Sequence, residues 1–130
     1  MTDDKQYPKP GDLIEIKRGI FQHWAVYAGD GNVIHAITAD DNSLPVSSGI
    51  EGIFARKALV KKHPLKNVAK EDEWRINNKY DRSRTPLPVE EIIPCAERWI
   101  NREVPYNVLG SNCEHFVTRL RYGEGVSDQV

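Results

Sequence analysis

The segment with the clearest chemical potential is residues 111–117, which reads SNCEHFV. Ser111 and Glu114 have the spacing of a capping box, in which a hydroxyl and a carboxylate satisfy free N–H groups at a helix start. Apolar residues then recur at helical spacing from Cys113 to Leu120. The pattern therefore predicts a helix with Cys113 at about its second position, on the inward face.

A cysteine in the first turn of a helix can serve as a nucleophile. The N–H groups and the positive end of the helix dipole stabilise a thiolate, which lowers the thiol pKa. The same N–H groups could hold the oxyanion that forms when sulfur attacks a carbonyl. The alternative is a buried core cysteine, and the helix alone leaves both interpretations open.

A thiol nucleophile needs a base, and two of the four histidines occupy suitable positions. His23 precedes Trp24, and His35 lies between two apolar residues, so both fall in expected strands. A Cys–His pair oriented by a third polar group is the generalised catalytic triad, and a second imidazole can orient the first. The alternative is a pair of hydrogen-bonded histidines with a purely structural role in the sheet.

Other uses of these residue types are less favoured. Cys113 and His115 together with the two strand histidines fit no familiar zinc spacing, so we expect no metal. We expect His63 to be exposed, because it follows Lys62 and precedes a proline. Cys95 falls within an apolar helical stripe and is expected to serve in packing.

The elements that must position these residues can be predicted from local patterns. Alternating apolar residues predict strands, and the 3.6-residue period predicts helices. Pro94 falls inside one helical pattern, where it removes a backbone hydrogen bond and is expected to kink the helix at a cost of roughly 3 kcal/mol. The expected strands are 13–16, 23–28, 33–37, 58–61 and 73–77; the expected helical segments are 65–69, 89–100 and 112–122; residues 78–86 are expected to form a polar connection.

The hairpin around residues 29–32 sets a geometric condition on the histidines. A two-residue turn at Asp30 and Gly31 would pair Val26 with His35 and put His23 and His35 on opposite faces of the sheet. Cooperation between the imidazoles therefore predicts a longer turn or a β-bulge.

Composition limits the classes of function. With 130 residues and 39% hydrophobic content, we expect a single domain spanning residues 1–130, with residues 1–10 as a loose lead-in. A net charge of −1 argues against nucleic acid as a partner. Two cysteines and an acidic start without a leader predict a reducing, cytoplasmic location.

A basic cluster of six residues has two interpretations. Such a cluster is usually a solvated face, but it could also attract an anionic membrane surface, with each charge contributing on the order of 1 kcal/mol. The six residues are Arg56, Lys57, Lys61, Lys62, Lys66 and Lys70.

Nearly the whole chain from about residue 8 resembles a known family. Residues 10–15 (PGDLIE), 23–27 (HWAVY), 29–35 (GDGNVIH) and 112–117 (NCEHFV) resemble the histidine and cysteine blocks of the phospholipase A and acyltransferase family. These proteins are small relatives of lecithin retinol acyltransferase. Two residues depart from the family pattern, namely Phe21, where a tyrosine is expected, and Pro94.

The resemblance implies a fold class and a set of site residues. The fold would be α+β and papain-like, circularly permuted so that an antiparallel sheet carrying the histidines packs against a helix carrying the cysteine. Cys113 would be the nucleophile that carries an acyl-thioester intermediate, His23 the general base and acid, and His35 the residue that orients His23. Arg18 would bind the lipid phosphate, and no metal or organic cofactor is implied.

The resemblance also implies an activity and partners. The expected enzyme is a calcium-independent phospholipase A1/A2 and acyltransferase, which N-acylates phosphatidylethanolamine and O-acylates lysophospholipid. Its partners would be glycerophospholipids, including phosphatidylcholine, at a membrane surface that it contacts peripherally as a monomer. Many members carry a hydrophobic C-terminal anchor, so a full-length protein could extend beyond Val130. The alternatives are a cysteine peptidase or amidase with the same triad, and a non-enzymatic interaction domain.

Overall fold

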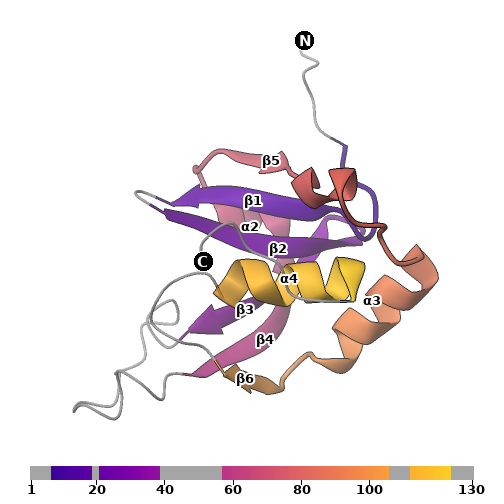
Figure 1. Cartoon of the computed structure of the whole chain (residues 1–130). Helices are drawn as coiled ribbons and strands as arrows, with labels where there is room; N and C mark the ends of the chain where they lie inside the picture. Colours follow the sequence, from indigo (N-terminus) through magenta and orange to yellow (C-terminus); the bar gives the residue numbers. More distant parts are fainter. Residues whose placement is uncertain (1–6, 19–20, 39–56, 106–111, 124–130) are drawn as a thin grey trace.

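The computed structural model describes residues 7–18, 21–38, 57–105 and 112–123, which adopt an α+β fold (Figure 1). The strands within these residues form one sheet in the order β5-β1-β2-β3-β4-β6, and each neighbouring pair is antiparallel. The strands are β1 (Leu13–Arg18), β2 (Phe21–Gly29), β3 (Asn32–Thr38), β4 (Lys57–Pro64), β5 (Trp74–Ile76) and β6 (Glu103–Pro105).

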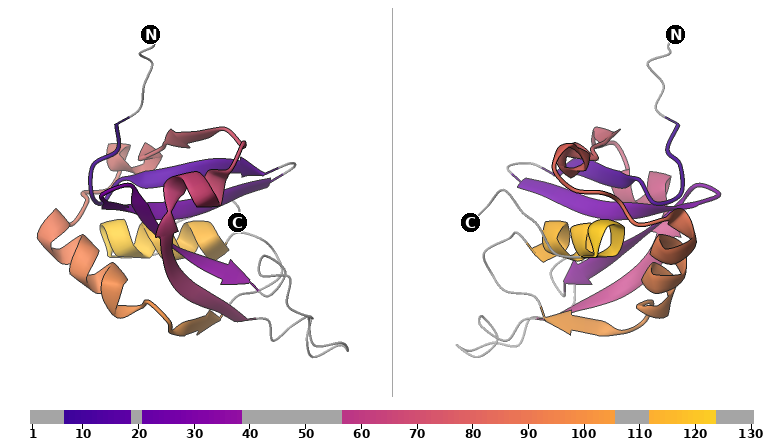
Figure 2. Two further views of the ribbon diagram at one scale, coloured as in Figure 1. Left: turned by 180° about the vertical axis from the view of Figure 1, so that it is seen from behind. Right: turned by 45° about the vertical axis from the view of Figure 1, so that its right-hand side comes forward.

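Helices lie on both faces of this sheet. Figure 1 shows α4 across the front face, and the reverse view in Figure 2 shows α2 on the other face. The helical segments are α2 (Leu65–Ala69), the 3-10 helix η1 (Lys79–Arg82), α3 (Val89–Arg98) and α4 (Asn112–Tyr122).

The structure contains the predicted strands and helices, with three differences from the prediction. Strand β4 continues to Pro64 instead of ending at Lys61, so it includes His63. The segment 78–86 is not simply a connection, because η1 forms within it. The short strand β6 pairs with β4 and was not predicted, since three residues carry too little periodicity to mark a strand.

Alternation along β2 divides the core between the two faces of the sheet. On one face, Trp24 and Val26 pack in the same buried cluster as Val117 and Leu120 of α4. On the other face, Ala25 belongs to a cluster with residues of β1 and α2. His23 lies directly opposite Ile16 of β1, which belongs to this second cluster, so His23 is on the α2 face.

Helix α3 accommodates Pro94 on its exposed side. The helix runs through this proline, while Ile92 and Ala96 on the opposite side are fully buried. Burying one isoleucine side chain contributes about 1.5–3 kcal/mol, which is comparable to the cost of an internal proline. Trp99 lies beyond the last helical residue and stacks edge-to-face on Phe116 of α4, with ring centroids 6.1 Å apart.

None of the helices in the described residues combines the length and the apolar character needed to cross a bilayer.

Candidate active site

The β2–β3 hairpin contains the predicted bulge. Val26 pairs with Ile34, and the register shifts between Tyr27 and Gly29. The turn uses positive φ angles at Gly29, Asp30 and Gly31, of 102°, 56° and 83°. Positive φ is inexpensive for glycine and tolerated by aspartate. With Val26 opposite Ile34 the register directs residue 25 toward residue 35, so His23 and His35 share one face.

The two imidazoles are joined by a hydrogen bond. Nε2 of His23 lies 2.8 Å from Nδ1 of His35, and the ring planes meet at 78°. Both side chains are buried, with 4% and 3% of their surface exposed. Within the described residues, Nδ1 of His23 has no hydrogen-bond partner. A neutral His23 that donates from Nε2 therefore presents Nδ1 as an acceptor.

The strands are not paired where the histidines lie. In the described structure, the pairing of β2 with β3 runs from Gly29 and Asn32 only as far as Val26 and Ile34. Beyond this point β2 continues to pair with β1, and β3 with β4. Helix α4 begins at the same end of the sheet, where β2 starts and β3 finishes (Figure 1). The first turn of α4 and the histidine pair therefore share one end of the sheet.

Burial controls the protonation state of His23. Desolvation of the imidazolium lowers the pKa of His23 to about 3, and the nearby positive charge of Arg18 adds to this effect. His23 is therefore neutral at physiological pH, as a general base must be. This low pKa disfavours the protonated His23 that would be needed for a preformed thiolate–imidazolium pair.

His63 is not the exposed residue expected from the sequence. It is half-buried, and its Nδ1 lies 3.0 Å from Nε2 of His35. The expectation failed because the strand was predicted to end at Lys61. Lys61 pairs with His35 and Val33 pairs with His63, so alternation in β4 brings His63 onto the histidine face. A strand predicted to continue through residue 63 would have placed His63 beside His35.

A hollow of about 480 Å³ opens beside the histidines on the α2 face. Arg18 lines it and donates from Nη2 to the backbone oxygen of Val68, over 3.0 Å. Lys70 and Asp72 also line it, so charged groups of both signs surround the cavity. Its lining residues are Arg18, His35, Ile37, His63, Asn67, Val68, Lys70 and Asp72.

Cys113 is the second residue of α4, as the capping pattern predicted. Its side chain lies outside the described part of the structure, as do Ser111 of the predicted capping box and the side chain of Phe21. The distance from the sulfur to His23 is therefore not defined. The structure brings together Arg18, His23 and His35, and places only the backbone of Cys113.

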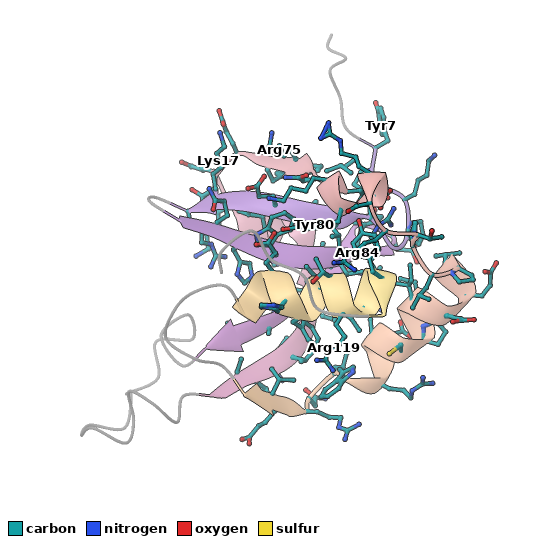
Figure 3. All side chains as sticks on the ribbon, viewed as in Figure 1. Tyr7, Lys17, Arg75, Tyr80, Arg84 and Arg119 are labelled. Atoms are coloured by element: carbon teal, nitrogen blue, oxygen red, sulfur yellow. The ribbon has the colours of Figure 1, made fainter. Side chains whose placement is uncertain are left out.

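The first turn of α4 is fixed to η1 by a buried carboxylate. Glu114 is 5% exposed and accepts a 2.8 Å hydrogen bond from the hydroxyl of Tyr80. The ammonium group of Lys79 lies 3.7 Å from the same carboxylate oxygen. Figure 3 shows Tyr80 beside α4. These contacts were not predicted, because 34 residues separate Tyr80 from Glu114.

The last turn of α4 is held by a second polar cluster. Arg121 donates to both carboxylate oxygens of Asp81, over 3.1 and 2.8 Å, and to the backbone oxygen of Gly11. Tyr122 also donates to Asp81, over 2.6 Å. Burial alone would raise the pKa of Asp81, but these hydrogen bonds and the charge of Arg121 lower it overall. Both ends of α4 are therefore connected to η1.

The other residues considered in the sequence, namely possible metal ligands, Cys95 and the basic cluster, lie in surroundings typical of structural roles. No three of the described histidine, cysteine and acidic residues are arranged to hold a metal ion. Cys95 is half-buried and packs against the core that α4 covers. In the basic cluster, Lys61 donates to Asn101 and Lys62 forms an ion pair with Glu97. Arg56 and the side chain of Lys57 lie outside the described residues.

Comparison with known proteins gives consistent matches. The family model for lecithin retinol acyltransferase matches residues 6–126. Phospholipase A and acyltransferase 1 of Homo sapiens is 56% identical over 124 residues, covering 95% of this chain and 73% of that protein. Phospholipase A and acyltransferase 3 of Mus musculus is 49% identical over 123 residues, covering 95% and 76%. Phospholipase A and acyltransferase 4 of Homo sapiens is 42% identical over 130 residues, covering 100% and 79%.

Proposed function

Because the chain belongs to the lecithin retinol acyltransferase family, we propose that it is a thiol phospholipase A and acyltransferase that acts on glycerophospholipids. The alignments with relatives that are named for this activity cover most of this chain and most of each relative, which supports the proposal. The single structural observation that carries it is the buried hydrogen bond between His23 and His35. Two histidines with a purely structural role would not need to leave Nδ1 of His23 without a partner among the described residues, at the end of the sheet where α4 begins.

In this mechanism Cys113 is the nucleophile and His23 is the general base. Nδ1 of His23 takes the thiol proton as the sulfur attacks the ester carbonyl of the phospholipid. His35 accepts the Nε2 proton of His23 in a hydrogen bond and thereby keeps Nδ1 available. Since burial favours neutral His23, proton transfer accompanies the attack instead of preceding it.

The negative charge of the tetrahedral intermediate develops at the start of α4. N–H groups of the first helical turn stabilise the oxyanion. Collapse of the intermediate breaks the ester bond, and His23 returns its proton to the departing lysophospholipid. An acyl-thioester remains on Cys113. Water then releases a fatty acid, the amine of phosphatidylethanolamine gives an N-acyl product, and a lysophospholipid hydroxyl gives O-acyl transfer.

Arg18 contacts the phosphate of the lipid in this proposal. Its guanidinium lines the hollow that also contains His35, so a phosphate there would lie beside the catalytic pair. The protein approaches the membrane surface peripherally and as a monomer. Its fold corresponds to a circularly permuted papain-like arrangement within a single domain, with the histidine strands preceding the cysteine helix.

Product analysis tests this function directly. The protein is incubated with vesicles of phosphatidylcholine and phosphatidylethanolamine, and the lipids are analysed by mass spectrometry. We expect free fatty acid, lysophospholipid and N-acyl-phosphatidylethanolamine, with almost none of these formed by Cys113→Ser. Cleavage of peptide or amide substrates with intact phospholipids would instead favour a peptidase or amidase. The absence of turnover together with an unreactive Cys113 would favour an interaction domain.

A further inference from the structure

Three imidazoles form a continuous hydrogen-bonded chain on the α2 face of the sheet. His23 contacts His35 over 2.8 Å, and His35 contacts His63 over 3.0 Å. The second pair of rings repeats the geometry of the first, with an interplanar angle of 78° in both. His63 is the most exposed of the three, because it is half-buried and lines the hollow whereas His23 and His35 are buried.

The chain couples the tautomers of the three rings. A neutral imidazole has one donor nitrogen and one acceptor nitrogen. If His23 is to accept a proton at Nδ1, its Nε2 must donate to Nδ1 of His35. His35 then carries its own proton on Nε2 and donates it to Nδ1 of His63. The state of His63 therefore decides which nitrogen of His23 can act as a base.

The same chain offers a path for charge. Proton transfer from Cys113 would leave an imidazolium on His23, where burial strongly opposes a positive charge. Transfer of the Nε2 proton of His23 to His35, and of the Nε2 proton of His35 to His63, moves that charge to the edge of the hollow. Three N–H or S–H bonds break and three N–H bonds form. The reverse sequence returns a proton to the departing lysophospholipid oxygen.

We propose that His63 is the terminal member of a proton relay, which fixes the reactive tautomer of His35 and accepts the positive charge produced when Cys113 is acylated. This inference rests on the proposed roles of Cys113 and His23, and it adds a third histidine to them. His63 acts through His35, so it is a positioning residue and not a group that touches the lipid ester.

The surroundings of His63 determine how acid affects the relay. Arg18 from β1 and Lys70 after α2 disfavour an additional positive charge in the hollow, whereas Asp72 favours it, and His35 is the direct neighbour. A resting His63 that gains a proton must donate from Nδ1. This donation reverses both hydrogen bonds and puts a proton on Nδ1 of His23. Acylation is therefore expected to stop when the resting His63 is protonated.

The first test measures tautomers and requires no lipid. Nitrogen NMR of the histidine-labelled chain at pH 7.5 should show His35 protonated at Nε2 and unprotonated at Nδ1. His63→Ala should abolish this preference, whereas His63→Gln should preserve it, because the glutamine oxygen can still accept the Nε2 proton. A His35 that carries its proton on Nδ1 in the native chain would overturn the proposal.

The second test measures the rate at which Cys113 is acylated by phosphatidylcholine vesicles in a single turnover. General acid–base catalysis contributes about 10²- to 10⁴-fold in total, so loss of the relay should remove only part of it: His63→Gln should slow acylation roughly 10-fold and His63→Ala roughly 100-fold. His63→Gln should also shift the acid limb of the pH profile to lower pH. For His63→Gln, the acylation rate plotted against the fraction of deuterium in the solvent should become linear, which indicates that one proton moves in the rate-determining step instead of several.

Arg98→Gln is the control, since Arg98 is exposed at the end of α3 and does not line the hollow. It should retain the native rate, pH profile and isotope dependence. Native values of all three quantities in both His63 variants would overturn the relay. If no form of the chain is acylated by lipid, the proposed function fails, and the NMR result still decides whether His63 sets the tautomer of His35.

Discussion

The direction of two hydrogen bonds decides whether His23 can act as a base. Its Nε2 is occupied by His35, and only the tautomer that donates from Nε2 offers Nδ1 to a thiol. The energetic cost of burying this ring is opposed by packing and by its contact with His35. This cost has a consequence for stability that can be measured without substrate.

We predict that His23 makes the protein less stable in mild acid. Its pKa in the folded chain is about 3, below the usual value of 6.5, so the unfolded chain binds the proton more readily. Stability from this residue is complete above pH 6.5 and decreases as the pH falls toward 3. At about 1.4 kcal/mol per pH unit, the loss between pH 6.5 and 4.5 is roughly 2–3 kcal/mol.

Urea unfolding at several pH values checks this prediction. His23→Gln should show a correspondingly flatter pH dependence than the native chain over the same interval, whatever its absolute stability. Parallel curves for the two proteins would show that His23 does not bind its proton differently in the folded and unfolded states.

At the scale of the elements, the site depends on how α4 is attached. Its packing residues contact the face of the sheet opposite the histidines, so burial alone does not fix where the helix begins. The hydrogen bond from Tyr80 to Glu114 links the first turn to η1, and Asp81 links the last turn to the same segment. The 3-10 helix therefore controls the position of the turn that carries Cys113.

We predict that Tyr80→Phe destabilises the fold by about 1–2 kcal/mol, because a buried carboxylate loses a hydrogen bond while Lys79 remains nearby. Thermal or urea unfolding measures this difference. Tyr7→Phe is the matched control, since Tyr7 is 79% exposed, and it should be neutral. Equal stability of Tyr80→Phe and the native chain would mean that this hydrogen bond contributes nothing to the attachment of α4.

Local sequence patterns predicted the elements better than the contacts between them. The strands other than β6, the α4 helix and the bulge near Gly29 could be predicted, because alternation and turn chemistry are local and the two histidines had to share a face. His63 was missed because the strand was predicted to end at Lys61, and Lys62 and Pro64 on either side of His63 suggested that it was exposed. The contact of Tyr80 with Glu114 depends on tertiary packing between distant segments, which leaves no periodic signal.

For the whole molecule, the proposed approach to a membrane depends on how charge is distributed over the surface. The net charge is −1, so attraction to anionic lipid must come from a local surface. Lys66 and Lys70 are exposed, and Lys70 lines the hollow that Arg18 also lines, whereas Lys62 forms an ion pair with Glu97. A neutral lipid surface provides no such electrostatic attraction.

We predict weak binding to phosphatidylcholine vesicles and stronger binding when anionic lipid is included. Added salt should reverse the gain, because surface charges are screened over about 8 Å at physiological ionic strength. Sedimentation with vesicles measures both effects. Lys66→Gln combined with Lys70→Gln should reduce the gain, and tight, salt-insensitive binding to neutral vesicles would contradict this account.

The central claim is that Cys113 carries the acyl group, and mass analysis of the intact chain and its peptides tests it most directly. After incubation with phosphatidylcholine, the account predicts one added fatty-acyl mass on Cys113, which neutral hydroxylamine removes, and no such mass on Cys95. Cys113→Ser should lose the adduct and nearly all activity, because a hydroxyl is a far poorer nucleophile without strong base assistance. Release of fatty acid by pure Cys113→Ser protein at the native rate would contradict the account.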